Sequence, residues 1–528
     1  MVASAHPLAT QAGLRILKKG GNAIDAAVAV QFALAVVYPN AGNIGGGGFM
    51  IYRNQQGEHF ALDYREMAPA AADKDMYLDA QGEVIPRLSL DGHLAAGVPG
   101  SVAGMVEAHH RFGKTAWKDL LQAAIDLAAR GFTLTHQQAE GLNRYQEAFK
   151  KLNTHRPAFI KDSPWKAGDV LVQKELAATL RRIQAEGRAG FYEGTTADFI
   201  VAEMKAGNGI ISHEDLKNYR AKWREPISFA YKDFQVVSMP PPSSGGIALA
   251  QLLKIIEDYP IASWGVHSVP SVHLMVEAER RVYADRASHL GDADFYPVPI
   301  ETLLDKDYLK NRMADFNPDK ATPSSEIIAG TIGKESEETT HFSIVDKQGN
   351  AVSITTTLNG SYGAKTVVSG AGFLLNNEMD DFSAKPGVPN LYGLVGAEAN
   401  AIAPGKRMLS SMTPTIVSKD GDLYMVVGTP GGSTIITSVF QTFLNVAEFG
   451  MPVSEAVQAP RFHHQWLPDR LFVEEDCLSE NTRAALENMG HHIKERASIG
   501  RVEAILLLPN GKLSGAADKR GDDSVGGF

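Results

Sequence analysis

The sequence predicts an α+β protein, because helix-like and strand-like patterns occupy different parts of the chain. Between about residues 100 and 340, apolar side chains recur at positions i, i+3 and i+4, which is typical of helices with one buried face. From residue 339 on, the pattern changes to short β-rich runs, and a long helix is expected at 433–449. Separate helical and β-rich stretches of this kind indicate an α+β fold.

The composition is that of an ordinary globular protein, and it excludes several functions. Hydrophobic residues make up 44% of the 528 residues and charged residues 21%. The formal net charge of −10 argues against nucleic acid as a partner, because its phosphates require a basic surface. The longest apolar stretch, 26–38, is interrupted by Gln31 and is too short to span a bilayer. Cys477, the single cysteine, cannot form an intrachain disulfide.

Residues 8–37 are predicted to form two helices. Gly20 and Gly21 end the first helix, and Asn22 is a suitable side-chain cap for the second. The glycine run 45–48 lacks the Lys-Ser/Thr that a phosphate loop requires, so we interpret it as backbone packed closely below a strand. Residues 49–64 then alternate like two strands around a turn.

In the middle of the chain, helices are expected where the apolar spacing is clearest, at 102–111, 117–130, 174–186, 196–206 and 247–258. The Pro-, Ser- and Gly-rich stretch 239–246 could be a linker, but an apolar helix follows at once, so we expect a rigid buried loop. Residues 318–338 are poor in apolar side chains and are expected to be exposed and mobile.

The β-rich part contains several short runs, predicted as strands at 340–345, 351–358, 366–375, 414–418 and 423–428. Residues 383–408 have little periodicity and are expected to form a long loop. The first two strands form a hairpin, with Gly349 at the turn position that requires a left-handed residue. If the hairpin is centred on Gln348, Thr339 faces Thr357 directly, although a bulge at Gly349 could shift the register by one.

Several short motifs carry a family resemblance. Glu338-Thr339-Thr340-His341, together with Thr-Leu-Asn at 357–359, resembles the processing and nucleophile region of the γ-glutamyltranspeptidases, which are N-terminal nucleophile (Ntn) hydrolases. Further motifs match in the family's order, at 45–49, 63–65, 376–382, 409–412, 429–433 and 459–464. The resemblance therefore covers nearly the whole chain.

The resemblance implies a four-layer αββα sandwich, with two stacked antiparallel sheets between helical layers. It also implies self-cleavage between Glu338 and Thr339, giving a large subunit, 1–338, and a small catalytic subunit, 339–528, that remain one intertwined domain. The new α-amino group of Thr339 would accept the proton of its own hydroxyl, since an unperturbed α-amine has a pKa of about 7.7–8.0. An isolated Thr-Thr-His would be better explained as part of an ordinary strand.

Three further groups are expected near the nucleophile. Thr357 would hydrogen-bond the hydroxyl of Thr339, whereas His341 is interpreted as a structural histidine. Gly431 and Gly432 lie between a predicted strand and a predicted helix, where backbone N–H groups can stabilise an oxyanion. Without the resemblance, an ordinary glycine turn would be the better interpretation.

A γ-glutamyl group carries an α-carboxylate and an α-ammonium, and the resemblance assigns residues to each. For the carboxylate, Arg65 offers a bidentate fork, and Ser410 and Ser411 offer hydroxyl donors. For the ammonium, Asp381 offers the negative charge, with Asn359 and Glu378 close by. Taken singly, these residues would be read as a surface arginine, a Ser-Ser turn and a solvated carboxylate cluster.

The implied activity is that of a γ-glutamyltransferase and glutathione hydrolase, with glutathione or other γ-glutamyl amides as donors and water, an amino acid or a dipeptide as acceptor. Tyr392 matches a lid-loop aromatic residue of some family members. We expect no cofactor, because no set of His, Asp and Glu has metal-ligand spacing. His463 and His464 are assigned no catalytic role. Neither nucleic acid nor a membrane is expected as a partner.

Localisation is predicted only through the resemblance. Family members in bacteria are usually exported, so a periplasmic or secreted protein is expected. No signal peptide is visible behind Met1, and the chain resembles one trimmed at its front.

Two alternatives remain. One is a glutaryl-type acylase of the same superfamily, whose substrate lacks the α-ammonium, so the pairing of Asp381 with Glu378 argues against it. The other is an unprocessed, non-catalytic protein that binds γ-glutamyl compounds. A denaturing gel distinguishes it, because a processed enzyme runs as two bands.

Overall fold

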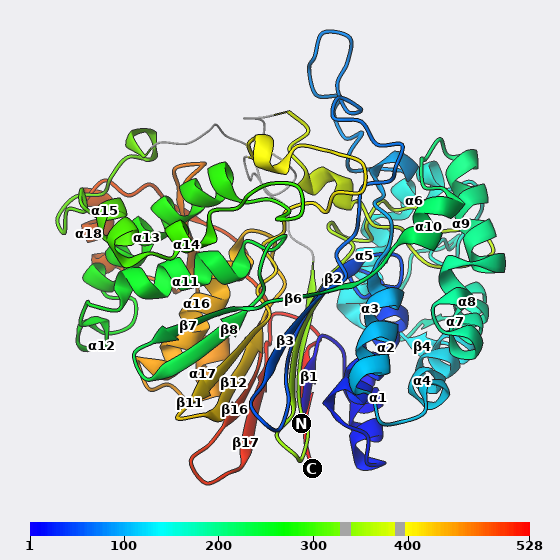
Figure 1. Ribbon diagram of the computed structural model, residues 1–528, viewed down its shortest axis with the longest axis horizontal. Coiled ribbons are helices and arrows are strands. Elements are labelled where there is room, and N and C mark those ends of the chain that lie inside the picture. The colour runs from blue at the N-terminus through cyan, green and yellow to red at the C-terminus, as the bar shows by residue number, and fades with distance from the viewer. Residues whose placement is uncertain (328–338, 386–395) are drawn as a thin grey trace.

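The protein has four layers, in which two β-sheets lie face to face and helices cover the outer side of each sheet (Figure 1). The computed structural model describes residues 1–327, 339–385 and 396–528. The αββα architecture expected from the family resemblance is thereby confirmed.

The first sheet has seven strands in the order β18-β1-β9-β10-β2-β3-β6, and all neighbours are antiparallel. In chain order these are β1 (Val2–Ser4), β2 (Gly47–Arg53), β3 (His59–Asp63), β6 (Lys222–Arg224), β9 (Thr340–Val345), β10 (Ala351–Thr357) and β18 (Ser524–Gly526). Strands from before and after Thr339 are therefore interleaved in this sheet, with β1 between β18 and β9, and β10 beside β2.

The second sheet has six antiparallel strands in the order β17-β16-β12-β11-β8-β7. They are β7 (Ile227–Tyr231), β8 (Phe234–Ser238), β11 (Thr415–Lys419), β12 (Asp422–Gly428), β16 (Glu503–Leu507) and β17 (Leu513–Ala517). The remaining strands form two small sheets at the periphery, β4 (Phe132–Thr133) with β5 (Val170–Leu171), and β13 (Phe462–His463), β14 (Leu471–Val473) and β15 (Ile493–Glu495).

Each sheet has its own helical layer (Figure 1). The layer beside the first sheet contains α1 (Pro7–Lys18), α2 (Ala23–Val37), α3 (Ser101–Phe112), α4 (Trp117–Arg130), α5 (His136–Arg144), α6 (Gln146–Leu152), α7 (Lys174–Glu186), α8 (Ala189–Tyr192), α9 (Gly194–Ala206) and α10 (His213–Asn218). The layer beside the second contains α11 (Gly245–Ile256), α12 (Ile261–Trp264), α13 (Val269–His289), α14 (Ile300–Leu303), α15 (Lys306–Arg312), α16 (Thr434–Ala447), α17 (Val453–Gln458) and α18 (Glu480–Asn488).

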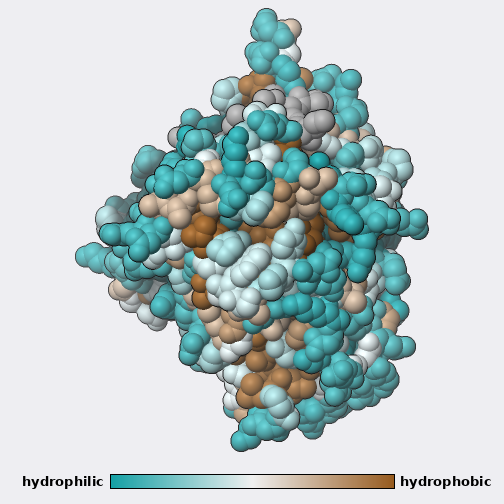
Figure 2. Space-filling view, turned by 90° about the vertical axis from the view of Figure 1, so that its left-hand side faces the viewer, coloured by the Kyte–Doolittle hydropathy of each residue, from teal (hydrophilic) through white to brown (hydrophobic). Residues whose placement is uncertain are grey.

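The outer surface of this second helical layer is mainly hydrophilic, with smaller apolar areas between the polar side chains (Figure 2). Its helices bury their apolar sides against the sheet instead. Among the described residues, none of the helices combines the length and the apolar character that crossing a membrane requires.

Three apolar cores separate the four layers, and successive residues of one strand enter different cores. Val426 of β12 packs between the two sheets, whereas Val427 packs against the second helical layer. Phe342 and Ile344 of β9 pack against the first helical layer, and Val345 packs between the sheets. Because both faces of the central strands are buried, apolar residues occupy both sets of alternating positions.

Local predictions near the site are confirmed. The α2 helix begins with a capping box between Asn22 and Asp25. Gly45–Gly48 packs as expected, since a Cβ atom at Gly46 would lie 2.0 Å from the carbonyl oxygen of Thr357. Residues 239–244 form a buried loop that leads directly into α11, and Ser243 of this loop pairs with Ser410.

One predicted strand is wrong, and one segment predicted to be exposed is only partly so. Residues 366–375 do not form a strand; Gly370 and Gly372 both have a φ of 75°, and only an isolated bridge joins Val367 to Leu374. In the described part of the segment expected to be exposed, 318–327, six residues are exposed, but Ala321, Thr322, Ser324 and Ile327 are buried. Hydrogen bonds such as that from the Ser324 N–H to Asp469 (2.8 Å) hold these four against the core.

Candidate active site

The predicted nucleophile lies at the start of β9, at the edge of a narrow pocket. The register of the hairpin is the one centred on Gln348, with Thr340 opposite Thr356 and no shift at the turn. Thr339 precedes this pairing and Thr357 follows it, and both side chains line the pocket. The Thr357 hydroxyl also accepts a hydrogen bond from the Asn359 N–H (2.7 Å).

We call this pocket the inner pocket. It brings together most residues that the sequence assigned to the site, and it is lined by Arg65, Arg286, Thr339, Thr357, Asn359, Glu378, Asp381, Ser410, Ser411, Met412, Gly432 and Ile435. These residues come from distant parts of the chain, and the two sheets and the loops at their ends bring them together.

Arg65 is the centre of the charged part of the inner pocket. Its side chain is 1% exposed. Its Nη1 atom lies 2.7 Å from Glu378 Oε2, and its Nη2 atom lies 2.5 Å from Asp381 Oδ2. The guanidinium also donates to two backbone carbonyls, from Nε to Met408 and from Nη2 to Leu409, both at 3.3 Å. Two protein carboxylates thus occupy the fork that the sequence analysis assigned to a substrate carboxylate.

The carboxyl groups around Arg65 outnumber its positive charge. Glu66 lies 3.6 Å from Nη1, so three buried carboxyl groups surround one guanidinium. Burial raises the pKa of Glu66 to about 8, against the opposing effect of Arg65. Burial likewise raises the pKa values of Glu378 and Asp381, although Arg65 opposes this. Burial disfavours the charged forms of these carboxyl groups, and a further cation beside the cluster would favour them, so such a cation would be stabilised there.

Ser410 and Ser411 lie on a buried loop beside this cluster. The Ser244 N–H and hydroxyl both donate to the Ser410 carbonyl, at 2.8 and 2.7 Å. The Ser410 hydroxyl accepts from the Met412 N–H (3.1 Å), and the Ser411 hydroxyl accepts from Arg286 Nη2 (3.1 Å). Both hydroxyls have therefore accepted a hydrogen bond and keep their own hydrogen to donate.

Gly431 and Gly432 connect β12 to α16, as predicted. Their carbonyls accept hydrogen bonds from the first turn of the helix, Gly431 from the Thr434 N–H (3.0 Å) and Gly432 from the Ile435 N–H (3.3 Å). Because a trans peptide points its N–H opposite to its C=O, the Gly432 N–H points away from the helix. Both glycines have positive φ values, 136° and 55°.

A second, wider depression meets the inner pocket at Thr339, and we call it the outer cleft. Its volume is about 430 Å³, and its lining includes Thr339, Gly431, Glu140, Arg144, Tyr145, Tyr362 and Arg501. Thr339 therefore lines both the narrow, charged inner pocket and the wider outer cleft.

Comparison with known proteins shows the family to which the chain belongs. The family model described as "Gamma-glutamyltranspeptidase" matches residues 9–528. The "Glutathione hydrolase proenzyme" of Escherichia coli (strain K12) is 49% identical over 532 residues, covering 100% of this chain and 92% of the relative. The chain belongs to the γ-glutamyltranspeptidase family.

Solved structures are similar as well. The cephalosporin acylase from Bacillus halodurans has a TM-score of 0.87 and 27% identity, covering 100% of this chain and 95% of its own. The γ-glutamyltranspeptidase of Helicobacter pylori has a TM-score of 0.61 and 46% identity, covering 62% of this chain and 94% of its own.

His341 makes the contacts of a structural histidine within this family member. It is fully buried between the sheets, where Nδ1 lies 2.9 Å from the Thr355 hydroxyl and Nε2 lies 3.0 Å from the Ser343 hydroxyl. Burial lowers its pKa to about 3, so the ring is neutral at pH 7.

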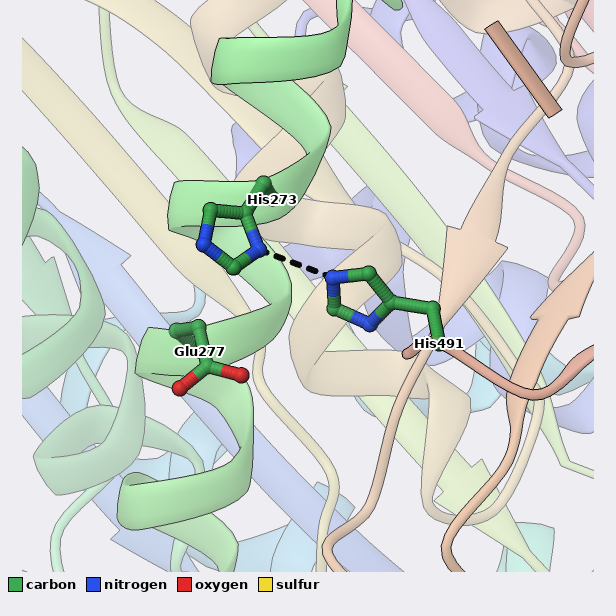
Figure 3. Close-up of side chains that lie close together, drawn as sticks. All are labelled: His273, Glu277 and His491. Atoms are coloured by element: carbon green, nitrogen blue, oxygen red, sulfur yellow. Dashed lines mark hydrogen bonds between the residues drawn. The ribbon is translucent and has the colours of Figure 1, made fainter. Parts of the chain in front are cut away.

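Among the described residues, one group of His and Glu side chains is close enough to hold a metal ion: His273, Glu277 and His491 (Figure 3). Their polar atoms already have protein partners. The His273 ring bridges His491 (2.8 Å) and the Asn317 carbonyl (2.8 Å), and Glu277 pairs with Arg281 (2.8 Å). A metal ion between the two rings would have to replace the hydrogen bond that joins His273 to His491, so we interpret the group as structural.

Two predicted site residues, Glu338 and Tyr392, lie outside the described residues. Three residues that line the inner pocket were not predicted as site residues: the apolar Met412 and Ile435, and the charged Arg286 of α13. The sequence feature that could have indicated Arg286 is the charged stretch 277–286, whose charges fall on every side of a helix. When such a helix is packed between other elements, some of these charged side chains must face the protein interior instead of solvent.

Proposed function

We propose that this protein is a γ-glutamyltransferase and glutathione hydrolase that uses Thr339 as its nucleophile. The observation that carries the proposal is the position of Thr339 beside the buried Arg65–Asp381–Glu378 cluster. One wall of the inner pocket supplies the attacking group, and the other supplies charges for the zwitterionic end of a γ-glutamyl group.

The enzyme is made as a precursor that cuts itself between Glu338 and Thr339, into residues 1–338 and 339–528. The Thr339 hydroxyl attacks the Glu338 carbonyl carbon and the C–N bond of the peptide breaks, which frees the α-amine of Thr339 and leaves an ester between the two residues. Water then hydrolyses this ester to the Glu338 carboxylate and the Thr339 hydroxyl. In support, the E. coli relative is named a proenzyme. The matched Helicobacter chain covers 62% of this chain, and a similar share, 338 of 528 residues, precedes Thr339.

In the mature enzyme, the α-amine of Thr339 takes the hydroxyl proton as the oxygen attacks the γ-carbonyl carbon of the donor. The N–H groups of Gly431 and Gly432 stabilise the resulting oxyanion, and Thr357 hydrogen-bonds the Thr339 hydroxyl. The leaving amine takes the proton, and a γ-glutamyl ester remains on Thr339. Water or the amine of an amino acid or dipeptide then releases it.

Recognition of the γ-glutamyl group uses both signs of charge. Arg65, Ser410 and Ser411 are assigned to the α-carboxylate, and Asp381 with Asn359 and Glu378 is assigned to the α-ammonium. Tyr392 is assigned to a lid over this side. A periplasmic or secreted location is proposed from the family alone.

The second candidate is a glutaryl-type acylase, since an acylase is among the similar structures. Three buried carboxyl groups beside one guanidinium favour a substrate with an ammonium group over one without it.

Product analysis tests the proposal. The purified protein is incubated with γ-glutamyl anilide or glutaryl anilide, with and without a dipeptide. Turnover of the first, with γ-glutamyl dipeptide formed when the acceptor is present, is expected. Equal turnover of glutaryl anilide would favour the acylase.

A further inference from the structure

Arg286 is a second arginine that lines the inner pocket, and its hydrogen-bond partners differ from those of Arg65. It lies in α13, and its side chain is 4% exposed. Its Nε atom donates to the Ser244 hydroxyl (2.9 Å), and its Nη2 atom donates to the Ser411 hydroxyl (3.1 Å). Ser411 is one of the two serines assigned to the substrate carboxylate.

The contact with Arg286 determines what the Ser411 hydroxyl can do. A guanidinium only donates hydrogen bonds, so the Ser411 oxygen must accept and its hydrogen is left to donate elsewhere. A hydroxyl that accepts from a cation is also polarised and becomes a stronger donor. A carboxylate, which only accepts, is the matching ligand for a hydroxyl set in this way.

The charge of Arg286 matters because Arg65 is already engaged. Arg65 directs Nη1 to Glu378 and Nη2 to Asp381, so a substrate carboxylate reaches its fork only by replacing one of them. Burial lowers the pKa of Arg286 to about 10, with Asp381 opposing this, so the guanidinium remains charged at neutral pH. The inner pocket therefore has a cation behind Ser411 that is not paired as Arg65 is.

We propose that Arg286 is a positioning residue for the α-carboxylate of the γ-glutamyl group, acting through Ser411. It fixes the Ser411 hydroxyl as a donor and places a positive charge behind it. The inference rests on the proposed function, and it adds a specificity role for a residue of α13.

A purely structural role would have different consequences. Ser244 bonds both Arg286 and the Ser410 carbonyl, so Arg286 also braces the loop that carries Ser410 and Ser411. If bracing were its whole role, its loss would weaken binding of every ligand of the pocket. If it acts on the carboxylate, its loss would weaken only ligands that have this group.

Competitive inhibition of the mature enzyme distinguishes the two roles. L-Glutamate and 4-aminobutyrate differ only by the α-carboxylate, and both are tested against Arg286→Gln, Arg286→Lys and the wild type. We expect Arg286→Gln to raise the Ki of glutamate about tenfold or more, and that of 4-aminobutyrate less than about threefold. Arg286→Lys keeps a charge but loses the bond geometry, so its Ki for glutamate should lie between those of the wild type and Arg286→Gln.

A double-mutant cycle with Ser411→Ala adds a second readout. Because Arg286 acts through the Ser411 hydroxyl, Arg286→Gln should cost markedly less in glutamate binding when Ser411 is already alanine. Full additivity, or equal Ki increases for both ligands, would overturn the proposal. So would failure of both Arg286 variants to mature on a denaturing gel, since that outcome assigns Arg286 to folding.

Failure of the proposed function gives a different result. In that case the wild-type protein itself neither turns over γ-glutamyl anilide nor is inhibited by glutamate, whatever stands at residue 286.

Discussion

The inner pocket and the outer cleft meet at Thr339 but hold their charged groups in different ways. In the inner pocket, Arg65 and Glu378 are at most 1% exposed and lie in contact with each other. In the outer cleft, Arg144 and Glu140 are exposed. Buried charges fix one arrangement and penalise ligands that do not match it, whereas exposed charges are screened by water and salt. The difference suits an enzyme that is strict about its donor and permissive about its acceptor.

The largest expected effect concerns the residue that the two sites share. Thr339→Ala removes the hydroxyl that attacks Glu338, so the chain should stay uncut and inactive. Intact mass measures the cleavage. Thr340→Val is the matched control, because Thr340 is buried and its hydroxyl makes no hydrogen bond within the described part of the chain. Thr340→Val should still be cut, and cleavage of Thr339→Ala at the same bond would contradict this mechanism.

Asp381→Asn should remove most of the preference of the inner pocket for substrates that carry an α-ammonium group. It leaves the substrate ammonium without its anion and Arg65 with one carboxylate fewer. The kcat/KM for γ-glutamyl anilide should fall about 100-fold or more, as for loss of one partner of a buried charged pair. Glutaryl anilide has no ammonium and serves as the control substrate. An equal loss on both substrates would argue against an ammonium site at Asp381.

Arg65→Lys keeps the charge but cannot hold Glu378 and Asp381 together. The change should mainly raise the KM for glutathione, by the equivalent of about 1–3 kcal/mol of lost binding. Steady-state kinetics of the mature variant provide the measurement. If kcat fell while KM stayed constant, Arg65 would act on the chemical step instead.

The dependence of rate on pH should come from Thr339 rather than from His341. The α-amine must be neutral to accept a proton, so the rate should rise with pH through one ionisation at or below about 7.7–8.0. His341, whose pKa burial lowers to about 3, is already deprotonated at pH 5 and cannot contribute this step. Mature His341→Ala should keep the acidic limb with a modest rate loss. Loss of the limb together with nearly all turnover would make the imidazole the base.

The smallest effect is expected in the outer cleft. Arg144→Ala should lower transfer to a dipeptide by no more than about fivefold, because an exposed charge contributes up to about 1 kcal/mol. Hydrolysis without acceptor should change less than transfer does. Glu140→Gln, at the same rim, is the matched variant and should change transfer in the opposite direction. If Arg144→Ala lowered transfer as much as Asp381→Asn lowers kcat/KM, the exposed charges of the outer cleft would matter as much as the buried ones, and the proposed difference between the two sites would be wrong.

Sequence alone was sufficient where the decisive contacts are local. The register of β9 and β10 was predicted from the alternation of residues and the turn at Gly349, since a hairpin of this length has few alternative pairings. The same reasoning wrongly predicted a strand at 366–375. The residues of this run are strand-like, but Gly370 and Gly372 turn the chain back.

The charged cluster could not be predicted from spacing. Arg65 and Asp381 are 316 residues apart, and only the family resemblance placed them together before the structure did. Arg286 was missed altogether, since nothing local indicates that one charge of a charge-rich helix faces a pocket rather than water. Long-range packing decides such cases.

Strands from both sides of residue 339 are interleaved in the first sheet, and this arrangement would hold the enzyme together after the proposed cleavage. Strand β9 lies between β1 and β10, and β1 also pairs with β18, so segments from both sides of residue 339 interlock. Pulling the two products apart would break ladders in both sheets, which amounts to unfolding. Their association should therefore not weaken on dilution, and two differently labelled mature samples should not exchange chains on mixing. The proposed cut would change the chemistry at one end of a strand, and the two pieces would still behave as a single molecule.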